Sequence, residues 1–381
     1  MRVKEMILLF ALFFSSCEEN NKYGNENETV ILIRLKDEKT FNMDTFADEH
    51  ISEIRYVPLE TNDESLIAEI EKVYLYKELI IIFDQRANRI LLFDMDGKYI
   101  RKIGRKGGGP NEYFSLNDIF FEESSGLIYA HERSKNVIFV YDLEGQIIET
   151  IQPSFHFNSF CKSKDGFWIY SCFQDNNPNG YNLMLVDNSM QKMIGGYFPQ
   201  HPNFINKTWA TRFRLDSEGV NYFAYPTSNC VYKLADSVPE IVYRVDFVNR
   251  NAPFEMIAEI ESSEEYEKLI ENEYLLMGNY NIWNETLIFN FSESAYNKPH
   301  TLYTCFYHKN STLHIAGGFD HAIKVPSSTI ISVSGQALIL YIWPYHLWIE
   351  EQREYMEKQI GEKLDEEANP ILIICYPKVE T

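Results

Sequence analysis

Short apolar runs separated by turn residues dominate the chain and predict strands over most of its length. Residues 89–94 (Arg-Ile-Leu-Leu-Phe-Asp) and 137–142 (Val-Ile-Phe-Val-Tyr-Asp) each end in an aromatic residue followed by Asp. A turn with Gly at its second position follows each run, Asp96-Gly97 in the first and Glu144-Gly145 in the second. An alternating strand pattern then resumes, so both segments are predicted to be β-hairpins.

The two hairpins belong to a longer internal repeat. Residues 83–104 align without gaps with the stretch that begins at His131, and Asp84 falls on Glu132. Weaker copies lie around residues 183–187, 230–234 and 302–306. The period of roughly 45 residues is the length of one four-stranded blade, and it predicts an all-β protein with the fold of a six-bladed β-propeller.

Both ends of the chain are expected to close this ring. The blades are predicted at about residues 66–105, 114–151, 155–199, 209–248, 275–322 and 329–378. An extra strand at Ile51–Glu60 precedes them, and we expect it to pair with a C-terminal strand at Ile371–Tyr376, because an open ring would leave unpaired edges. Two short helical insertions are also predicted, one at Phe254–Leu276 between blades and one at Trp348–Glu367 within the last blade.

Residues 83–113 carry a family resemblance. Their Asp, their Arg-Ile pair, their aromatic-Asp-x-x-Gly turn and their Gly-Pro-x-Glu-aromatic link resemble an NHL-type repeat, although Ala87 stands where such repeats usually carry Asn. Together with the N-terminus and the ending at residues 369–376, the chain resembles the six-bladed propeller lipoproteins of Gram-negative gut anaerobes. This resemblance implies the fold, since that family is better described by its fold than by an activity.

The N-terminus is typical of an exported lipoprotein. A basic start leads into the apolar run Met6–Phe14 and then Ser15-Ser16-Cys17, which predicts a signal peptide at residues 1–16 and lipidation of Cys17. An ordinary cleaved signal followed by an unrelated Cys is the alternative. Residues 17–50 are expected to form a flexible tether and lead-in, and residues 51–381 the propeller. Acidic residues after Cys17 resemble a surface-export signal, which favours an outer-membrane anchor with the protein exposed at the cell surface.

Charge and cysteine content narrow the function classes. The formal charge of −21 argues against nucleic acid, which is bound through Lys and Arg. Lipidation of Cys17 leaves five Cys, an odd and widely spaced set that does not indicate a disulfide framework. Cys161 and Cys172 flank a turn, but a hairpin through Asp165-Gly166 would pair Cys161 with Tyr170 instead of Cys172.

The candidate ligand-binding residues lie in the loops that a propeller gathers around its axis. Gly104–Pro110 joins two strands and lacks Gly-Lys-Ser/Thr, so it is not a phosphate loop. Hydrolase and zinc motifs are also missing from the sequence. The loop residues chosen are Asp84, Arg86, Arg105, Asn111, Glu112, Glu132, Arg133, Trp209 and Arg212. Their Arg side chains suit a carboxylate or sulfate, unless they pair with the loop acids between blades.

Aromatic and histidine residues add further candidates. Trp209 and Trp283 are possible platforms for sugar rings. His131 and His201 are the histidines best placed for a functional role, although a lone His is more often structural.

Two function classes remain. The first is a tethered, non-catalytic module that binds a glycan, a peptide or a partner protein and needs no cofactor. The second is a metal-dependent propeller enzyme, resembling lactonases or lyases, with a divalent cation in the central channel. We favour binding because the sequence carries no catalytic signature and a fold alone does not establish chemistry.

Overall fold

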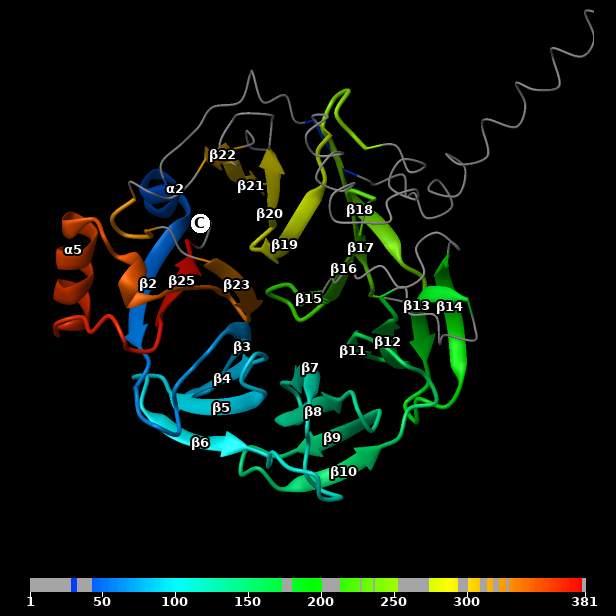
Figure 1. Ribbon diagram of the computed structural model, residues 1–381. Coiled ribbons are helices and arrows are strands. Elements are labelled where there is room, and N and C mark those ends of the chain that lie inside the picture. Colours follow the sequence, from blue (N-terminus) through cyan, green and yellow to red (C-terminus); the bar gives the residue numbers. More distant parts are fainter. Residues whose placement is uncertain are drawn as a thin grey trace, which may run out of the picture.

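Six β-sheets stand around a central axis in the computed structural model, so the predicted propeller is confirmed (Figure 1). The structure describes residues 29–32, 43–172, 180–200, 213–226, 228–235, 237–252, 274–293, 301–308, 314–317, 322–326 and 329–378. The first strand of each blade is the innermost, and these six strands surround the central axis (Figure 1).

The first three blades are regular four-stranded antiparallel sheets. Blade 1 contains β3 (Ile70–Tyr76), β4 (Leu79–Asp84), β5 (Arg89–Asp94) and β6 (Tyr99–Ile103). Blade 2 contains β7 (Leu116–Glu122), β8 (Leu127–Glu132), β9 (Val137–Tyr141) and β10 (Ile147–Ile151). Blade 3 contains β11 (Ser159–Ser163), β12 (Gly166–Tyr170), β13 (Tyr181–Val186) and β14 (Met193–Pro199).

The later blades add segments from the N-terminal part of the chain. Blade 4 contains β15 (Arg214–Leu215), β16 (Asn221–Tyr225), β17 (Cys230–Lys233) and β18 (Glu240–Asp246), and β1 (Thr29–Leu32) pairs in parallel with β18 at its outer edge. Blade 5 contains β19 (Met277–Trp283), β20 (Thr286–Glu293), β21 (Thr301–His308) and β22 (His314–Gly317). Blade 6 contains β23 (Thr329–Ser334), β24 (Ala337–Ile342), β25 (Ile371–Pro377) and β2 (Ile51–Pro58).

Blade 6 closes the ring with strands from both ends of the chain, as predicted. β2 pairs antiparallel with β25 from Ile51 opposite Pro377 to Pro58 opposite Ile371, and the two strands lie side by side in Figure 1. The turn of blade 1 then packs on the end of β2, where a Cβ atom on Gly97 would overlap the Pro58 carbonyl oxygen. Gly97 also has a φ of +81°, so both its conformation and its closest contact require glycine.

The Asp residues of the aromatic-Asp pairs hold the hairpin turns. Asp94 Oδ1 accepts hydrogen bonds from the backbone N–H groups of Asp96 and Lys98, both at 2.9 Å. Asp142 Oδ1 accepts one from Gln146 at 2.7 Å, and Asp187 repeats the arrangement in blade 3. Because a local carboxylate satisfies these turn N–H groups, the sequence repeat marks the outer hairpin of each of these blades.

A repeated Asn connects successive blades. Asn88, Asn136 and Asn229 adopt φ values of +50° to +56° in the turn after the second strand. Asn88 Oδ1 accepts the N–H of Leu116 in the next blade, and Asn229 Oδ1 accepts that of Met277, both at 2.8 Å. These side chains accept backbone N–H groups that have no partner strand in the space between two sheets.

Two predictions about local structure need correction. The first hairpin of blade 3 turns through Lys164-Asp165, so Cys161 lies opposite Trp168 and not Tyr170. Gly166 begins β12, where a Cβ atom would overlap the Val186 carbonyl oxygen, so the glycine serves close strand packing and not the turn. Cys161 and Cys172 are both buried, as are Cys230, Cys305 and Cys375.

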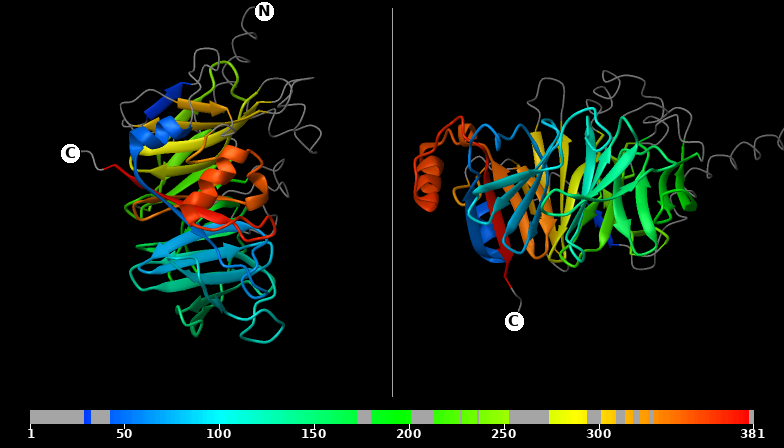
Figure 2. Two further views of the ribbon diagram at one scale, coloured as in Figure 1. Left: turned by 90° about the vertical axis from the view of Figure 1, so that its left-hand side faces the viewer. Right: turned by 90° about the horizontal axis from the view of Figure 1, so that it is seen from below.

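The helices differ in extent from the prediction. α5 (Glu350–Ile360) forms within the predicted Trp348–Glu367 segment and lies outside the ring of blades (Figure 2). The predicted Phe254–Leu276 helix falls mostly outside the described residues. An unpredicted helix, α2 (Met43–His50), precedes β2 and buries Met43 and Phe46 in the core of the last blades. Within the described ranges, no helix is long and apolar enough to cross a membrane.

Candidate functional site

The two loop acids of the candidate site are buried and hold backbone groups. Asp84 is fully buried, and its carboxylate accepts the N–H groups of Ala68 (2.7 Å) and Ala87 (2.9 Å). Glu132, its repeat equivalent, accepts those of Ser115 (3.0 Å) and Lys135 (2.6 Å). Each acid therefore ties the loop after the second strand of its own blade to the segment that enters that blade.

The electrostatics of Glu132 agree with this arrangement. Burial by itself raises the pKa of this carboxyl, but the backbone N–H groups that surround it lower the pKa to below its ordinary value. Glu132 is thus held as a carboxylate by the main chain, without an Arg partner among the described residues.

Arg105 and Glu112 form an ion pair within the loop between blades 1 and 2. Arg105 Nε lies 3.4 Å from Glu112 Oε1, and the Arg105 side chain is 83% exposed. Glu112 also accepts the N–H of Gly109 at 2.9 Å, and Asn111 beside it is exposed. An ion pair this exposed contributes little to stability, so the guanidinium stays accessible to a ligand.

Arg86 and Arg133 project from the neighbouring loops. Both are exposed, and among the described residues neither has an ion-pair partner. The N–H of Arg133 donates to the Ser115 carbonyl oxygen at 3.0 Å, and Lys106 Nζ lies 3.5 Å from the Ala87 carbonyl oxygen. These contacts join the three loops that carry the Arg residues.

An exposed aromatic residue lies in the loop that also carries Arg105. Phe114 is 65% exposed and directly precedes Ser115, which is bonded to Arg133. No sequence motif marks Phe114, which follows the buried Tyr113, so its exposure was not predicted. We call the set Arg86, Arg105, Lys106, Phe114 and Arg133 the loop surface.

The remaining sequence candidates are either outside the described residues or buried. Trp209, Arg212 and His201 lie outside the described residues. Trp283 is 1% exposed and donates its indole N–H to the Gln336 carbonyl oxygen at 2.9 Å, so its prediction as a sugar platform is wrong. The tryptophan instead fills the space between blades 5 and 6.

His131 is a core residue of blade 2. Its ring stacks on Phe157 with centroids 4.1 Å apart, and Nε2 lies 3.3 Å from Asn136 Oδ1. Burial lowers the pKa of this imidazole to about 4, which keeps it neutral near pH 7. A neutral, fully enclosed ring is available neither as a surface ligand nor as a proton donor to substrate.

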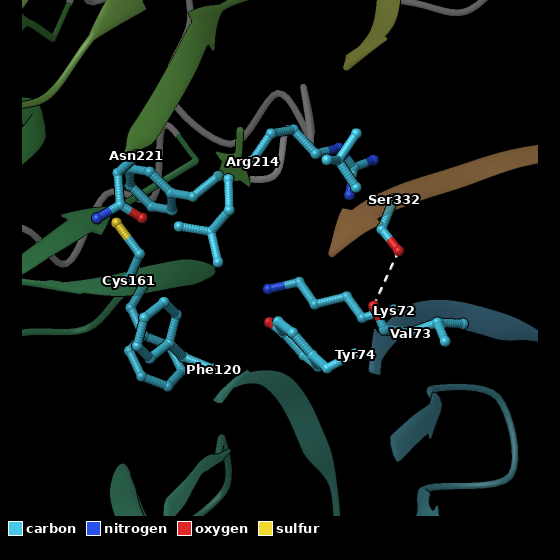
Figure 3. A pocket seen from close by; sticks show the side chains of 12 residues that line it. Lys72, Val73, Tyr74, Phe120, Cys161, Arg214, Asn221 and Ser332 are labelled. Carbon is cyan, nitrogen blue, oxygen red and sulfur yellow. Dashed lines mark hydrogen bonds between the residues drawn. The ribbon is translucent and has the colours of Figure 1, made fainter. Parts of the chain in front are cut away.

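A small cavity between the innermost strands is lined by two cations. Lys72, Tyr74 and Arg214 point into a common space between the innermost strands (Figure 3). The cavity there has a volume of about 20 Å³, enough for about one water molecule. Asn221 also lines it, and its buried Oδ1 has no hydrogen-bond partner among the described residues. A water that donates to this oxygen fits the space.

Lys72 forms an ion pair with Asp118 at the wall of this cavity. No sequence motif indicated this pair. Lys72 Nζ lies 2.7 Å from Asp118 Oδ1 and donates to the Ile119 carbonyl oxygen at 2.8 Å. Asp118 Oδ2 accepts the N–H of Phe160 at 3.1 Å, which joins blade 2 to blade 3. In the part of the chain that the structure describes, no three His, Cys, Asp or Glu side chains gather as a metal site.

The fold and the closure of its last blade define a six-bladed β-propeller. The chain belongs to the DUF4934 family, a domain of unknown function, whose model matches residues 30–376. A comparison with the curated proteins found no match.

Two of the solved structures similar to this chain share its fold. A Bacteroides fragilis protein inferred to be exported is 17% identical with a TM-score of 0.76, and the match covers 92% of this chain and all of that one. A DUF4221 family member from Bacteroides vulgatus is 10% identical with a TM-score of 0.52, covering 86% of this chain and 97% of that one. At these identities the similarity establishes architecture alone.

Proposed function

We propose that this propeller is a non-catalytic binding module, anchored by lipid at the cell surface, whose loop surface binds an anionic glycan, peptide or partner protein. The proposal depends on one observation: Arg86, Arg105, Arg133 and Phe114 are exposed in neighbouring loops. The buried acids of these loops, Asp84 and Glu132, do not neutralise them, because their carboxylates are hydrogen-bonded to the main chain. Exposed Arg and aromatic side chains are the residue types that dominate binding energies at interfaces.

The charge of the loop surface supports an anionic ligand. Four of its five residues are cations, whereas the whole chain has a formal charge of −21. Guanidinium groups bind carboxylates and sulfates with charge-assisted hydrogen bonds, which makes a local basic surface selective for such groups. The negative remainder of the protein repels the same ligands, so the attraction is confined to these loops.

The chemistry of the channel favours binding over the metal-dependent alternative. A divalent cation on the axis would meet the Lys72 ammonium and the Arg214 guanidinium, which repel it. The Asp118 carboxylate next to Lys72 is already bonded to that ammonium and to two backbone N–H groups. A cavity of about 20 Å³ also leaves no room for an organic substrate.

The cellular location of the protein is part of the proposal. Ser15-Ser16-Cys17 at the end of the apolar run supports lipidation of Cys17 and export, and the acidic residues that follow support display on the outer membrane. The resemblance of residues 83–113 to NHL-type repeats is part of the same proposal.

An array of sulfated, uronic-acid and neutral glycans together with acidic peptides tests the proposal on the full-length chain. The best anionic ligand is then titrated against wild type, Arg86→Ala and Arg133→Ala, with and without EDTA. Each change should cost about 1.5–3 kcal/mol of binding free energy, the usual contribution of a hydrogen bond to a charged group. Lys358→Ala, an exposed cation on α5, is the matched control and should bind as wild type.

Two results would argue against the loop surface. If the Arg variants lose thermal stability but no specific binding, these residues serve the interface between blades 1 and 2. If EDTA abolishes binding or reveals a lost hydrolytic activity, the metal-dependent alternative replaces the proposal.

A further inference from the structure

A row of aromatic rings stands in the segment between β24 and α5. Trp343 and Tyr345 are stacked with ring centroids 5.5 Å apart and planes inclined by 24°. Tyr345 meets His346 edge-on at 4.4 Å, and His346 lies 6.0 Å from Trp348. We call these four residues the aromatic row.

Two members of the aromatic row, Tyr345 and Trp348, are unusually exposed for large aromatic side chains. Trp348 is 73% exposed and Tyr345 is 49% exposed, whereas Trp168 and Trp283 are fully buried between blades. A tryptophan left in water forgoes the large stabilisation that burial of its ring provides. Two such rings in neighbouring positions indicate a surface that is covered when a ligand binds.

The segment that carries the row is firmly held. Pro344 begins a 3-10 turn, η2 (Pro344–His346), and both Pro344 and Leu347 are buried. Trp343 packs against the core cluster shared by blades 1 and 6. Because Trp343, Pro344 and Leu347 anchor the segment, the exposed rings are presented in a fixed arrangement and lose little conformational entropy on binding.

A polar pocket at the rim of the propeller borders the segment that carries the row. It has a volume of about 470 Å³ and lies between the loop after α5, the end of β2 and the outer hairpin of blade 1. Pro344, a member of the segment that carries the row, forms part of its wall. Its charged lining residues are Glu60, Asp96, Lys98, Glu362, Lys363 and Asp365. Acceptors outnumber cationic donors there, so the pocket suits hydroxyl groups better than anions.

We propose that the aromatic row and the adjoining rim pocket form a carbohydrate-binding site for a neutral oligosaccharide. The flat faces of Trp348 and Tyr345 stack on the apolar faces of pyranose rings, and the carboxylates of the rim pocket accept hydrogen bonds from sugar hydroxyls. The volume of the pocket is in the range of sites that enclose small organic ligands. A peptide is the weaker fit, because the row offers flat rings and a polar pocket instead of apolar holes for side chains.

This site rests on the proposed binding role but uses none of the residues of the loop surface. It lies on the insertion of blade 6 near α5, at the outer edge of the ring (Figure 2). The two sites also differ in charge preference, since the loop surface is basic and the rim pocket is mainly acidic. Their failures can therefore be told apart with separate variants.

The experiment titrates neutral hexasaccharides of β-linked glucose, xylose, mannose and galactose, and of α-linked glucose, into the full-length chain. The protein is kept in a detergent without a sugar headgroup, and binding is followed by calorimetry. We expect at least one hexasaccharide to bind, Trp348→Ala to weaken it at least tenfold, and Trp348→Phe to retain more affinity than Trp348→Ala. Ile148→Ala, at an exposed apolar residue of blade 2 outside both sites, is the control and should leave this binding unchanged.

Thermal unfolding of each variant separates a loss of binding from a loss of folding, and little change is expected because Trp348 is so exposed. Absence of binding to all five hexasaccharides overturns the carbohydrate assignment. Equal affinity of wild type and Trp348→Ala overturns the site. A proline-rich peptide that binds through Trp348 and is not displaced by any hexasaccharide also overturns the assignment. None of these results alters the expected behaviour of Arg86→Ala and Arg133→Ala toward an anionic ligand.

Discussion

Lys72 and Asp118 form a buried ion pair between the innermost strands of blades 1 and 2, with 2.7 Å between Nζ and Oδ1. The same Asp118 carboxylate reaches blade 3 through the N–H of Phe160. Three consecutive blades are thus joined at the axis by one charged group that is fully enclosed.

Replacing Lys72 by Met should strongly destabilise the protein, because it leaves the Asp118 carboxylate buried without its cation. The expected loss is about 3–5 kcal/mol of unfolding free energy, measured by urea denaturation. Lys162→Met is the control, since the Lys162–Glu122 pair is partly open to solvent and should cost about 1 kcal/mol or less. Equal losses in the two variants would contradict a special role for the axial pair.

His131 should make the protein less stable in mild acid. Its pKa is held at about 4 by burial, below its ordinary value of about 6.5, so the folded state favours the neutral ring. The stabilisation is fully present above pH 6.5 and is lost as the pH falls toward 4, by up to about 3 kcal/mol. In His131→Phe this part of the pH dependence should disappear, and unfolding curves between pH 7 and 4.5 measure it. Parallel pH profiles of the two proteins would sink the idea.

Asp84 should contribute to stability through the backbone groups that it binds. In Asp84→Asn an amide NH₂ replaces one acceptor oxygen, which leaves a buried N–H unsatisfied and costs about 1–3 kcal/mol. Asp96→Asn, which changes an exposed carboxylate paired with Arg55, should cost less than about 1 kcal/mol. Thermal melts of both variants decide the matter, and a neutral Asp84→Asn would return this residue to the list of ligand contacts.

Removal of β2 should open the ring. Without residues 51–60 the edge of β25 is unpaired, and we expect a lower melting temperature and aggregation in size-exclusion chromatography. Removal of Thr29–Leu32 is the matched control, because β1 is a fifth strand outside its blade's antiparallel set. A monomeric product with wild-type melting after loss of β2 would require another closure.

Cys17 should carry the membrane anchor. Changing Cys17 to Ala is expected to release the protein from the membrane fraction or to block processing of the signal, because the thiol is the attachment point for lipid. Fractionation followed by mass spectrometry of the mature N-terminus is the measurement. A Cys17→Ala protein that is processed and sediments with membranes as wild type does would remove lipidation from the proposal.

The architecture could be predicted because it is encoded by short-range chemistry that repeats. Asp94 and Asp142 each satisfy N–H groups within four residues, so the hairpins are visible in the sequence. The closure by Ile51–Glu60 followed from a general need to cover strand edges. Both inferences use only local patterns or rules that apply to all propellers.

Contacts between blades could not be predicted in the same way. The burial of Trp283 depends on Gln336, and the Lys72–Asp118 pair joins residues in different blades without any shared motif. The turn of blade 3 was misassigned by one residue because Gly166 looks like a turn residue but serves contact with Val186 on the next strand. Exposure of Phe114 and Trp348 likewise depends on neighbours that are distant in sequence.

The pairing of β2 with β25 also sets an order of assembly. Ile51 and Pro377 are separated by nearly the whole propeller, so the last blade cannot form until the C-terminal residues are present. For a chain that crosses a membrane N-terminus first, β2 emerges early and must wait unpaired while the other blades fold. A chain that ends prematurely keeps this edge open, and such products are expected to aggregate or to be cleaved by proteases.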